Sequence, residues 1–252
     1  MDRPIAYDKL AREDRFVRMR PRAVADLRVE QGLSTFPDLT TPDSIRDRIH
    51  GIMVGELQAM EGAGRTVYDF PDAPWEFTMD MARQVWDESR HVEIYLALID
   101  HLGGYVGEFP ETTILWRCAC AEDAAARVAG VNRGLEGLAC DVFNQLIHVA
   151  KKLGDPVIER AVDFVLADEI THVRMGSRWL NELTRDDPER RRRAIEFQDS
   201  IDERFNLGGV RREADADTEV GIAITRETRR LAGFTDEEID RLIKSTQRSP
   251  VY

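Results

Sequence analysis

Two stretches of this chain carry the same pattern, Asp-Glu-x-x-His, in which x is any residue. They are Asp87–His91 and Asp168–His172, and they include two of the five histidines in the sequence. On a helix, a glutamate and a histidine three positions apart point from the same face. Each stretch can therefore bind a metal ion through both side chains from a rigid backbone. The two matching stretches predict a metal centre built from two similar halves.

Two further glutamates stand at matching positions in the two halves. Glu56 lies 32 residues before Glu88, and Glu136 lies 33 residues before Glu169. In dinuclear centres of helical bundles, each of two helices contributes one glutamate and each of the other two contributes a Glu-x-x-His pair. The sequence therefore predicts six metal ligands: Glu56, Glu88, His91, Glu136, Glu169 and His172.

The predicted donor set also indicates which metals it would bind. Carboxylate oxygens combined with imidazole suit iron or manganese. We expect two iron ions as the cofactor, with manganese or a mixed manganese–iron pair as the alternatives. Burying four carboxylates without a counter-charge is unfavourable, because burial disfavours the charged form. The pattern therefore favours a metal centre over an empty polar core.

Several neighbours of the predicted ligands are expected to support the site. Asp87 and Asp168 are each placed to accept the second N–H of a metal-bound imidazole and fix its orientation; the alternative is that both are exposed acids. Tyr95 is predicted to transfer an electron or donate a hydrogen bond, with ordinary core packing as its alternative. Glu56, Glu136 and Tyr95 are the residues expected to take part in the chemistry, because a carboxylate ligand can shift between bridging and terminal binding.

Prolines, glycines and capping residues divide the middle of the chain into long helical segments. A capping residue followed by proline opens a helix at Pro42, Pro156 and Pro188. Gly62, Gly64 and the stretch Asp69–Asp72 are expected to break the first helix, which should run to about Arg65. Apolar residues recur at helical spacing, and no segment alternates with the period of a strand. The predicted helices cover about 42–65, 74–102, 118–153 and 156–183, followed by one from 188 and a short one after Thr235.

The lengths of the links between these helices set the predicted topology. Short links join the first helix to the second and the third to the fourth, while residues 103–115 form a longer connector. This connectivity is that of an all-α, ferritin-like four-helix bundle with one long crossover. We expect the bundle at residues 41–184, flanked by helical extensions at residues 1–40 and 185–252.

The composition limits the partners and the location. The 252 residues carry a formal net charge of −12, which opposes a nucleic-acid backbone, and the cluster Arg190–Arg193 is interpreted as a solvated helix face. The sequence lacks a run of about 20 apolar residues, and its charged start is unlike a signal peptide. Three cysteines cannot all pair within one chain, so we expect reduced thiols and a cytoplasmic location.

Four short motifs of this chain resemble those of the ferritin-like superfamily and, more closely, of domain-of-unknown-function family 455. The similarity covers about residues 45–183 and rests on Gly55–Glu61, Asp87–His91, Leu135–Asp141 and Asp168–Val173. Related sequences of that family often carry a histidine before the first glutamate, where this chain has Gly55. The resemblance implies a helical bundle with a dinuclear metal centre. In the wider superfamily that centre serves oxidases, hydroxylases, desaturases, N-oxygenases, ferroxidases and peroxidases.

The donor set and the resemblance together favour an oxidoreductase that activates dioxygen at two iron ions and oxidises a small organic substrate. An external electron donor is expected to reduce the metals. One alternative is a ferroxidase, in which iron itself is the substrate; a second is a tRNA-modifying hydroxylase, which the acidic charge disfavours; a third is a helical scaffold without activity. Neither a membrane nor nucleic acid is expected as a partner, and bundles of this kind commonly form homodimers.

Overall fold

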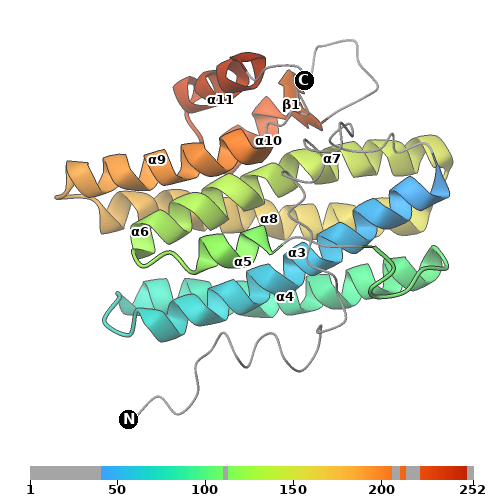
Figure 1. Ribbon diagram of the computed structural model, residues 1–252, viewed down its shortest axis with the longest axis horizontal. Helices are drawn as coiled ribbons and strands as arrows, with labels where there is room; N and C mark the ends of the chain where they lie inside the picture. Colours follow the sequence, from blue (N-terminus) through green and yellow to red (C-terminus); the bar gives the residue numbers. More distant parts are fainter. Residues whose placement is uncertain (1–40, 110–112, 206–210, 214–221, 249–252) are drawn as a thin grey trace. The chain divides into compact units, whose positions relative to one another are not determined.

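The computed structural model describes residues 41–109, 113–205, 211–213 and 222–248. In these residues the fold is an all-α helical bundle, as predicted, with the addition of one pair of very short strands (Figure 1). The described chain divides into two compact units. The first covers Ile45–Ala119 and the second the residues from Cys120 onward. The predicted extension at residues 1–40 lies outside the described residues.

The first unit is built on two long helices, α3 (Pro42–Asp69) and α4 (Trp75–His101), which lie side by side (Figure 1). Helix α3 begins at the proline that the sequence predicts, and α4 covers almost the predicted range. Arg46, near the start of α3, pairs with Glu108, just after the end of α4, at 2.8 Å. The two helices therefore run antiparallel, and each turns one buried face toward the other.

The end of α3 differs from the prediction. The sequence predicts an end at about Arg65, from Gly62, Gly64 and the stretch Asp69–Asp72, yet α3 passes both glycines and ends at Asp69. At Gly62 a Cβ atom would lie 2.7 Å from the Cβ of Ala119, at the end of the short helix α5 (Ile114–Ala119). This glycine permits a close helix–helix contact, and a glycine inside a helix costs only about 1 kcal/mol relative to alanine. Packing therefore outweighs the weak local signal.

The second unit is built on α7 (Glu136–Leu153) and α8 (Pro156–Leu183), which pack against each other. Gly154, with a φ of 68°, ends α7 at the predicted position. The Asp155 side chain then accepts hydrogen bonds at 3.0 and 3.1 Å from two N–H groups in the first turn of α8. These local signals end one helix and start the next, so the end of α7 and the start of α8 were predictable.

The predicted third helix, residues 118–153, is interrupted, which corrects the prediction. Helix α5 ends at Ala119, a new helix α6 (Ala124–Arg127) follows, and a π-helix, η1 (Val128–Leu135), leads into α7. The Asp123 carboxylate caps α6 by accepting a hydrogen bond from the Ala126 N–H at 3.0 Å. Apolar spacing continues across this stop and start, so periodicity alone could not reveal it.

In the described residues, the C-terminal part of the second unit contains three helices and a small parallel sheet. Helix α9 starts at the predicted proline, and α11 starts at the predicted capping box, in which Thr235 and Glu238 form hydrogen bonds of 2.9 and 3.2 Å. Helix α10 and the strands were not predicted, because such short elements give no periodic pattern. The elements are α9 (Pro188–Phe205), β1 (Arg211–Glu213), β2 (Ile222–Ile224), α10 (Arg226–Leu231) and α11 (Asp236–Arg248).

Candidate metal site

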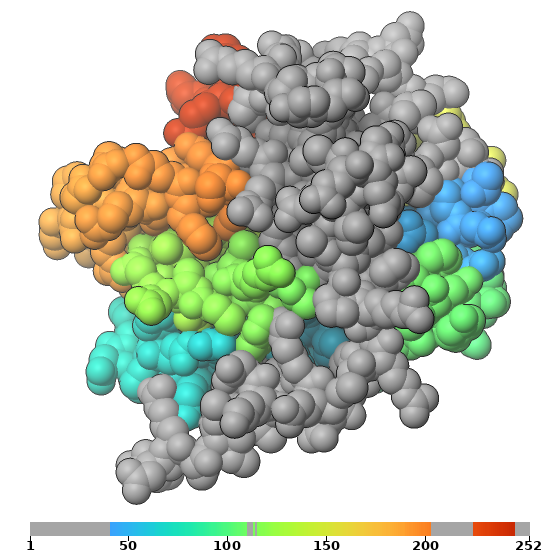
Figure 2. Space-filling view, in the orientation of Figure 1, coloured from blue at the N-terminus to red at the C-terminus, as the bar shows by residue number. Residues whose placement is uncertain are grey.

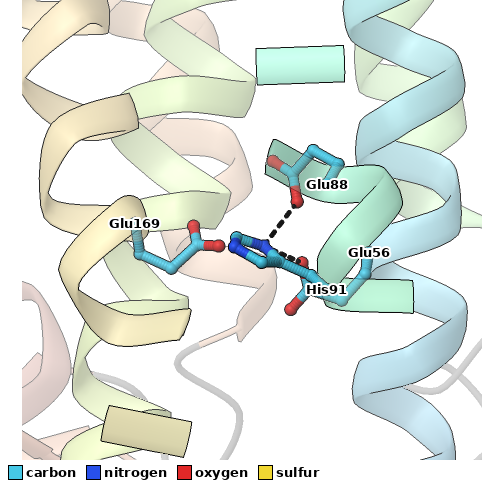
Figure 3. Close-up of side chains that lie close together, drawn as sticks. All are labelled: Glu56, Glu88, His91 and Glu169. Atoms are coloured by element: carbon cyan, nitrogen blue, oxygen red, sulfur yellow. Dashed lines mark hydrogen bonds and ion pairs between the residues drawn. The ribbon is translucent and has the colours of Figure 1, made fainter. Parts of the chain in front are cut away.

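Three predicted ligands meet in the first unit, and we call Glu56, Glu88 and His91 the first triad. Each offers one ligand atom, and these atoms lie within 4.8 Å of one another. His91 Nδ1 lies 3.1 Å from an oxygen of Glu88 and 3.3 Å from an oxygen of Glu56 (Figure 3). Figure 3 also labels Glu169, which belongs to the second unit. The first triad is therefore a group that could hold a metal ion.

Two helices position the first triad. Glu88 and His91 lie one turn apart on the buried side of α4, and Glu56 lies on α3; their exposed fractions are 0%, 0% and 5%. Gln84, one turn before Glu88, donates its side-chain N–H to Glu88 Oε1 at 3.1 Å. The other oxygen of Glu88 is the one that faces His91. Gln84 therefore fixes the orientation of this carboxylate.

The remaining predicted ligands meet in the second unit, and we call Glu136, Glu169 and His172 the second triad. Their ligand atoms also lie within 4.8 Å of one another. Glu169 and His172 lie one turn apart on α8, with 3.7 Å between Oε2 and Nδ1, and Glu136 is the first residue of α7. All three are buried. The structure thus gathers the six predicted ligands in two groups of the same composition.

Glu136 follows directly after the π-helix η1. A π-helix bonds each N–H to the carbonyl five residues back, so the side chains that follow point in directions different from those of an uninterrupted α-helix. Close packing on α8 accompanies this segment: a Cβ at Gly176 would lie 2.5 Å from the Cβ of Asn132. The direction of the Glu136 side chain therefore depends on tertiary packing as well as on its place in the sequence.

The predicted supporting residues have different surroundings. Asp87 is buried, which excludes the alternative of an exposed acid, and it pairs with Arg83 at 3.3 Å and with Arg90, both on its own helix. Asp168 is half-buried on α8, and Tyr95 is fully buried on α4. The contact of each aspartate with an imidazole stays a prediction. The burial of Tyr95 agrees with either role considered for it.

Cys140 shows how the charges around the second triad are distributed. Burial raises the pKa of its thiol well above the ordinary value. The negative charges of Glu169, Asp141 and Glu136 also raise this pKa, whereas Arg229 lowers it. Cys140 is therefore a neutral thiol near neutral pH, and these four charged groups surround it. The three cysteines form no disulfide, as predicted.

Two charged residues beside the second triad were not predicted from the sequence. Arg229 and Asp141 are fully buried and form an ion pair at 2.6 Å. Arg229 lies on the unpredicted helix α10, 88 residues from its partner. Since no local spacing relates the two residues, only the folded chain could bring them together. Gln84, by contrast, could have been found from its position one turn before Glu88.

The arginine cluster and the polarity of the helices are relevant to the prediction that neither nucleic acid nor a membrane is a partner. The cluster Arg190–Arg193 lies near the start of α9, which Figure 2 shows exposed along one side of the second unit. Arg190 pairs with Asp123 at 2.7 Å, and Arg192 pairs with Glu189 at 2.5 Å. The pair of Arg192 with Glu189 is local and exposed, which agrees with a solvated helix face, whereas the pair of Arg190 with Asp123 connects α9 to the N-cap of α6. Every helix in the described part of the chain is too short or too polar to cross a lipid bilayer.

Comparison with known families places the chain among its relatives. A family model described as "Protein of unknown function (DUF455)" matches residues 7–240. The chain belongs to the DUF455 family. A similar protein is an uncharacterized one from Haemophilus influenzae, which is 26% identical to this DUF455 chain over 178 residues. The alignment covers 70% of this chain and 57% of that protein, so the chain spans little more than half the length of this relative.

Proposed function

We propose that this DUF455 protein is a ferritin-like oxidoreductase in which two iron ions activate dioxygen to oxidise a small organic substrate. The six ligands that the sequence pattern predicts are proposed to bind these ions as one dinuclear centre. The observation that carries the proposal is the burial of four glutamates and two histidines whose ligand atoms converge in two groups of three. Such groups are unfavourable in a protein interior unless cations neutralise them.

The donor set fits a metal ion in spacing and in chemistry. Ligand atoms bound to one ion at about 2.0–2.2 Å lie roughly 3 to 4 Å apart. The distances within each triad, all up to 4.8 Å, are compatible with that spacing after small side-chain movements. Carboxylates with imidazole suit iron or manganese. The repetition of the same donors in both units favours two ions over one.

The roles of the protein's own residues follow from their positions. When bound, the metal ions would supply the redox chemistry with dioxygen and electrons from an external donor. Glu56 and Glu136 are each the only predicted ligand on their helix, and each would supply one carboxylate to hold the metal ions. Gln84 holds Glu88 in orientation. Tyr95, fully buried on α4, excludes water and is proposed to donate a hydrogen bond or an electron.

The first test loads the full chain with ferrous iron without oxygen, removes excess metal and measures the iron content. We expect about two irons per chain. On admission of air, the optical spectrum should change, and Mössbauer spectra should show two magnetically coupled ferric ions. One iron or none, or two uncoupled ions, would contradict a shared dinuclear centre. Sustained dioxygen consumption with a reductant, after the added iron is oxidised, would separate an oxidase or oxygenase from a ferroxidase.

Glu136→Ala tests the ligand assignment. We expect this variant to lower iron content and dioxygen consumption together, because it removes one donor of the second triad. The matched control is Glu159→Ala in the first turn of the same helix as Glu169, which removes a 3.8 Å contact with Lys151 and leaves the six predicted ligands unchanged. Unchanged binding of two irons by Glu136→Ala would exclude Glu136 as a ligand.

A further inference from the structure

One arginine of the C-terminal segment reaches the helix that carries Glu136. Arg229 on α10 is fully buried, and its Nη2 donates a hydrogen bond to Asp141 of α7 at 2.6 Å. Burial by itself would lower the pKa of Arg229, but the charge and hydrogen bonds of Asp141 leave that pKa above its ordinary value. The guanidinium is therefore a permanent cation held against α7.

The same guanidinium occupies the space beside Gly137, the residue that follows Glu136. A Cβ at Gly137 would lie 2.7 Å from Nη1 and 3.3 Å from Cζ of Arg229. Such contacts are possible only because this position has no side chain. Arg229 thus fills the space that a side chain at Gly137 would need, next to Glu136, and forms its ion pair one turn further along α7.

A second arginine secures the chain before Glu136. Arg133 in η1 is buried and donates a hydrogen bond to Glu238 of α11 at 2.5 Å. The guanidinium groups of Arg133 and Arg229 both lie over the ring of Phe234, at 4.5 and 5.0 Å from its centroid. Elements α10 and α11 therefore contact the chain on both sides of Glu136.

This support lies at the junction between the π-helix and α7. π-helices are rare and occur mostly as single turns within α-helices, so an eight-residue π segment needs tertiary contacts to keep its register. Two more hydrogen bonds hold the start of α10 along α7. The Thr225 N–H donates to Asp141 at 3.0 Å, and the Asn144 side chain donates to Thr228 at 3.2 Å.

We infer that Arg229 is a positioning residue of the metal centre, which holds the turn of α7 that carries Glu136 in the register that metal binding requires. Helix α10 then contributes to metal binding, although it carries none of the predicted ligands. This inference rests on the function proposed above. Residues that orient metal ligands without binding the metal typically change metal affinity by about 10- to 100-fold when they are replaced.

The test replaces the buried ion pair by apolar residues, in the double variant Arg229→Met/Asp141→Leu of the full chain. Replacing a buried ion pair in this way often preserves stability, so we expect the variant to fold. Methionine, however, places no atom where Nη1 lies beside Gly137. The probe is Co²⁺ alone, because its visible absorption per bound ion reports the number and geometry of its ligands.

Wild-type protein is expected to bind about two Co²⁺ per chain. In the double variant, affinity for at least one ion should fall about 10- to 100-fold, with a changed absorption per bound ion. Arg229→Lys keeps a cation for Asp141 and should recover part of the affinity. The matched control, Arg230→Met, removes the neighbouring arginine and its exposed pair with Asp236. It should change neither the Co²⁺ affinity nor the absorption per bound ion.

A folded double variant with wild-type Co²⁺ affinity and spectrum would overturn the inference and leave the proposed function intact. A lower melting temperature with an unchanged spectrum would also overturn it, since Arg229 would then be purely structural. Gly137→Ala is the second perturbation, for the case in which the double variant does not fold, because its methyl group would displace Nη1. A fall in Co²⁺ affinity of the same size in Gly137→Ala would support the inference, and wild-type Co²⁺ affinity in that variant would overturn it. Failure of the wild type to bind Co²⁺ would overturn both proposals.

Discussion

At the scale of single residues, His91 has one contact that depends on local spacing and one that depends on helix packing. Its spacing from Glu88 places both side chains on one face of α4 regardless of what packs against that helix, so this pair was predictable. The 3.3 Å approach of Glu56 to the same nitrogen requires α3 and α4 to pack in one particular register. The residue types of the first triad were therefore predictable, but their convergence was not assured.

The three cysteines are predicted to differ in reactivity. Cys120 is half-buried, whereas Cys118 and Cys140 are buried. The thiolate is the reactive form, and burial raises the pKa of Cys140. We therefore expect iodoacetamide at about pH 8 to modify Cys120 first and Cys140 last, as measured by mass spectrometry of timed samples. Denatured protein, in which all three should react alike, is the control, and earlier labelling of Cys140 in native protein would contradict the prediction.

The raised pKa of Cys140 also has a consequence for stability. The folded state holds this thiol neutral above the pH at which the unfolded chain ionises it. Its contribution to stability is therefore complete below the ordinary thiol pKa and is lost as the pH rises through the folded pKa. Cys140→Ser, compared with wild type by chemical denaturation at neutral and alkaline pH, should show less of this alkaline loss. An identical loss in both proteins would contradict the assignment.

At the scale of elements, capping residues fixed helix ends more reliably than glycines did. Asp155 is the clearest case, because its carboxylate accepts two N–H groups at the start of α8. Asp155→Ala should lower the free energy of unfolding by about 1 kcal/mol. Asp163→Ala, an exposed position within the same helix, is the matched control and should stay within about 0.5 kcal/mol of wild type. Equal effects of the two substitutions in thermal unfolding would argue against a capping role.

Glycines inside helices serve close packing in this fold. A Cβ at Gly176 would lie 2.5 Å from Asn132 Cβ, whereas a Cβ at Gly55 meets nothing within 4 Å. Gly176→Ala should therefore destabilise the protein by about 1–3 kcal/mol. Gly55→Ala, the control, should be neutral or stabilising by up to about 1 kcal/mol, because alanine favours the helix. Thermal unfolding measures both changes, and a stable Gly176→Ala variant would mean that η1 and α8 can move apart.

At the scale of the whole molecule, the proposed metal centre would stabilise the folded protein. A ligand that binds only the folded state at 100 times its dissociation constant stabilises that state by about 2.7 kcal/mol. For a chain of this size that corresponds to a rise in melting temperature of about 5–10 °C. Calorimetry of metal-loaded and chelator-treated protein would measure the difference, and Glu136→Ala should show a smaller one. Equal melting temperatures for both wild-type forms would contradict a buried metal centre.

The sequence by itself determined the helical class, both ends of α8 and the six residues that the structure buries in two triads. These features depend on signals a few residues apart, such as a cap, a proline or a Glu-x-x-His spacing, which act before any tertiary contact forms. Tertiary structure decided the stop at Ala119, the π-helix before Glu136 and the ion pair of Arg229 with Asp141. The two residues of that ion pair lie 88 positions apart, and its stability depends on the loss of their hydration and on their mutual attraction in the folded chain. No local sequence pattern indicates either effect.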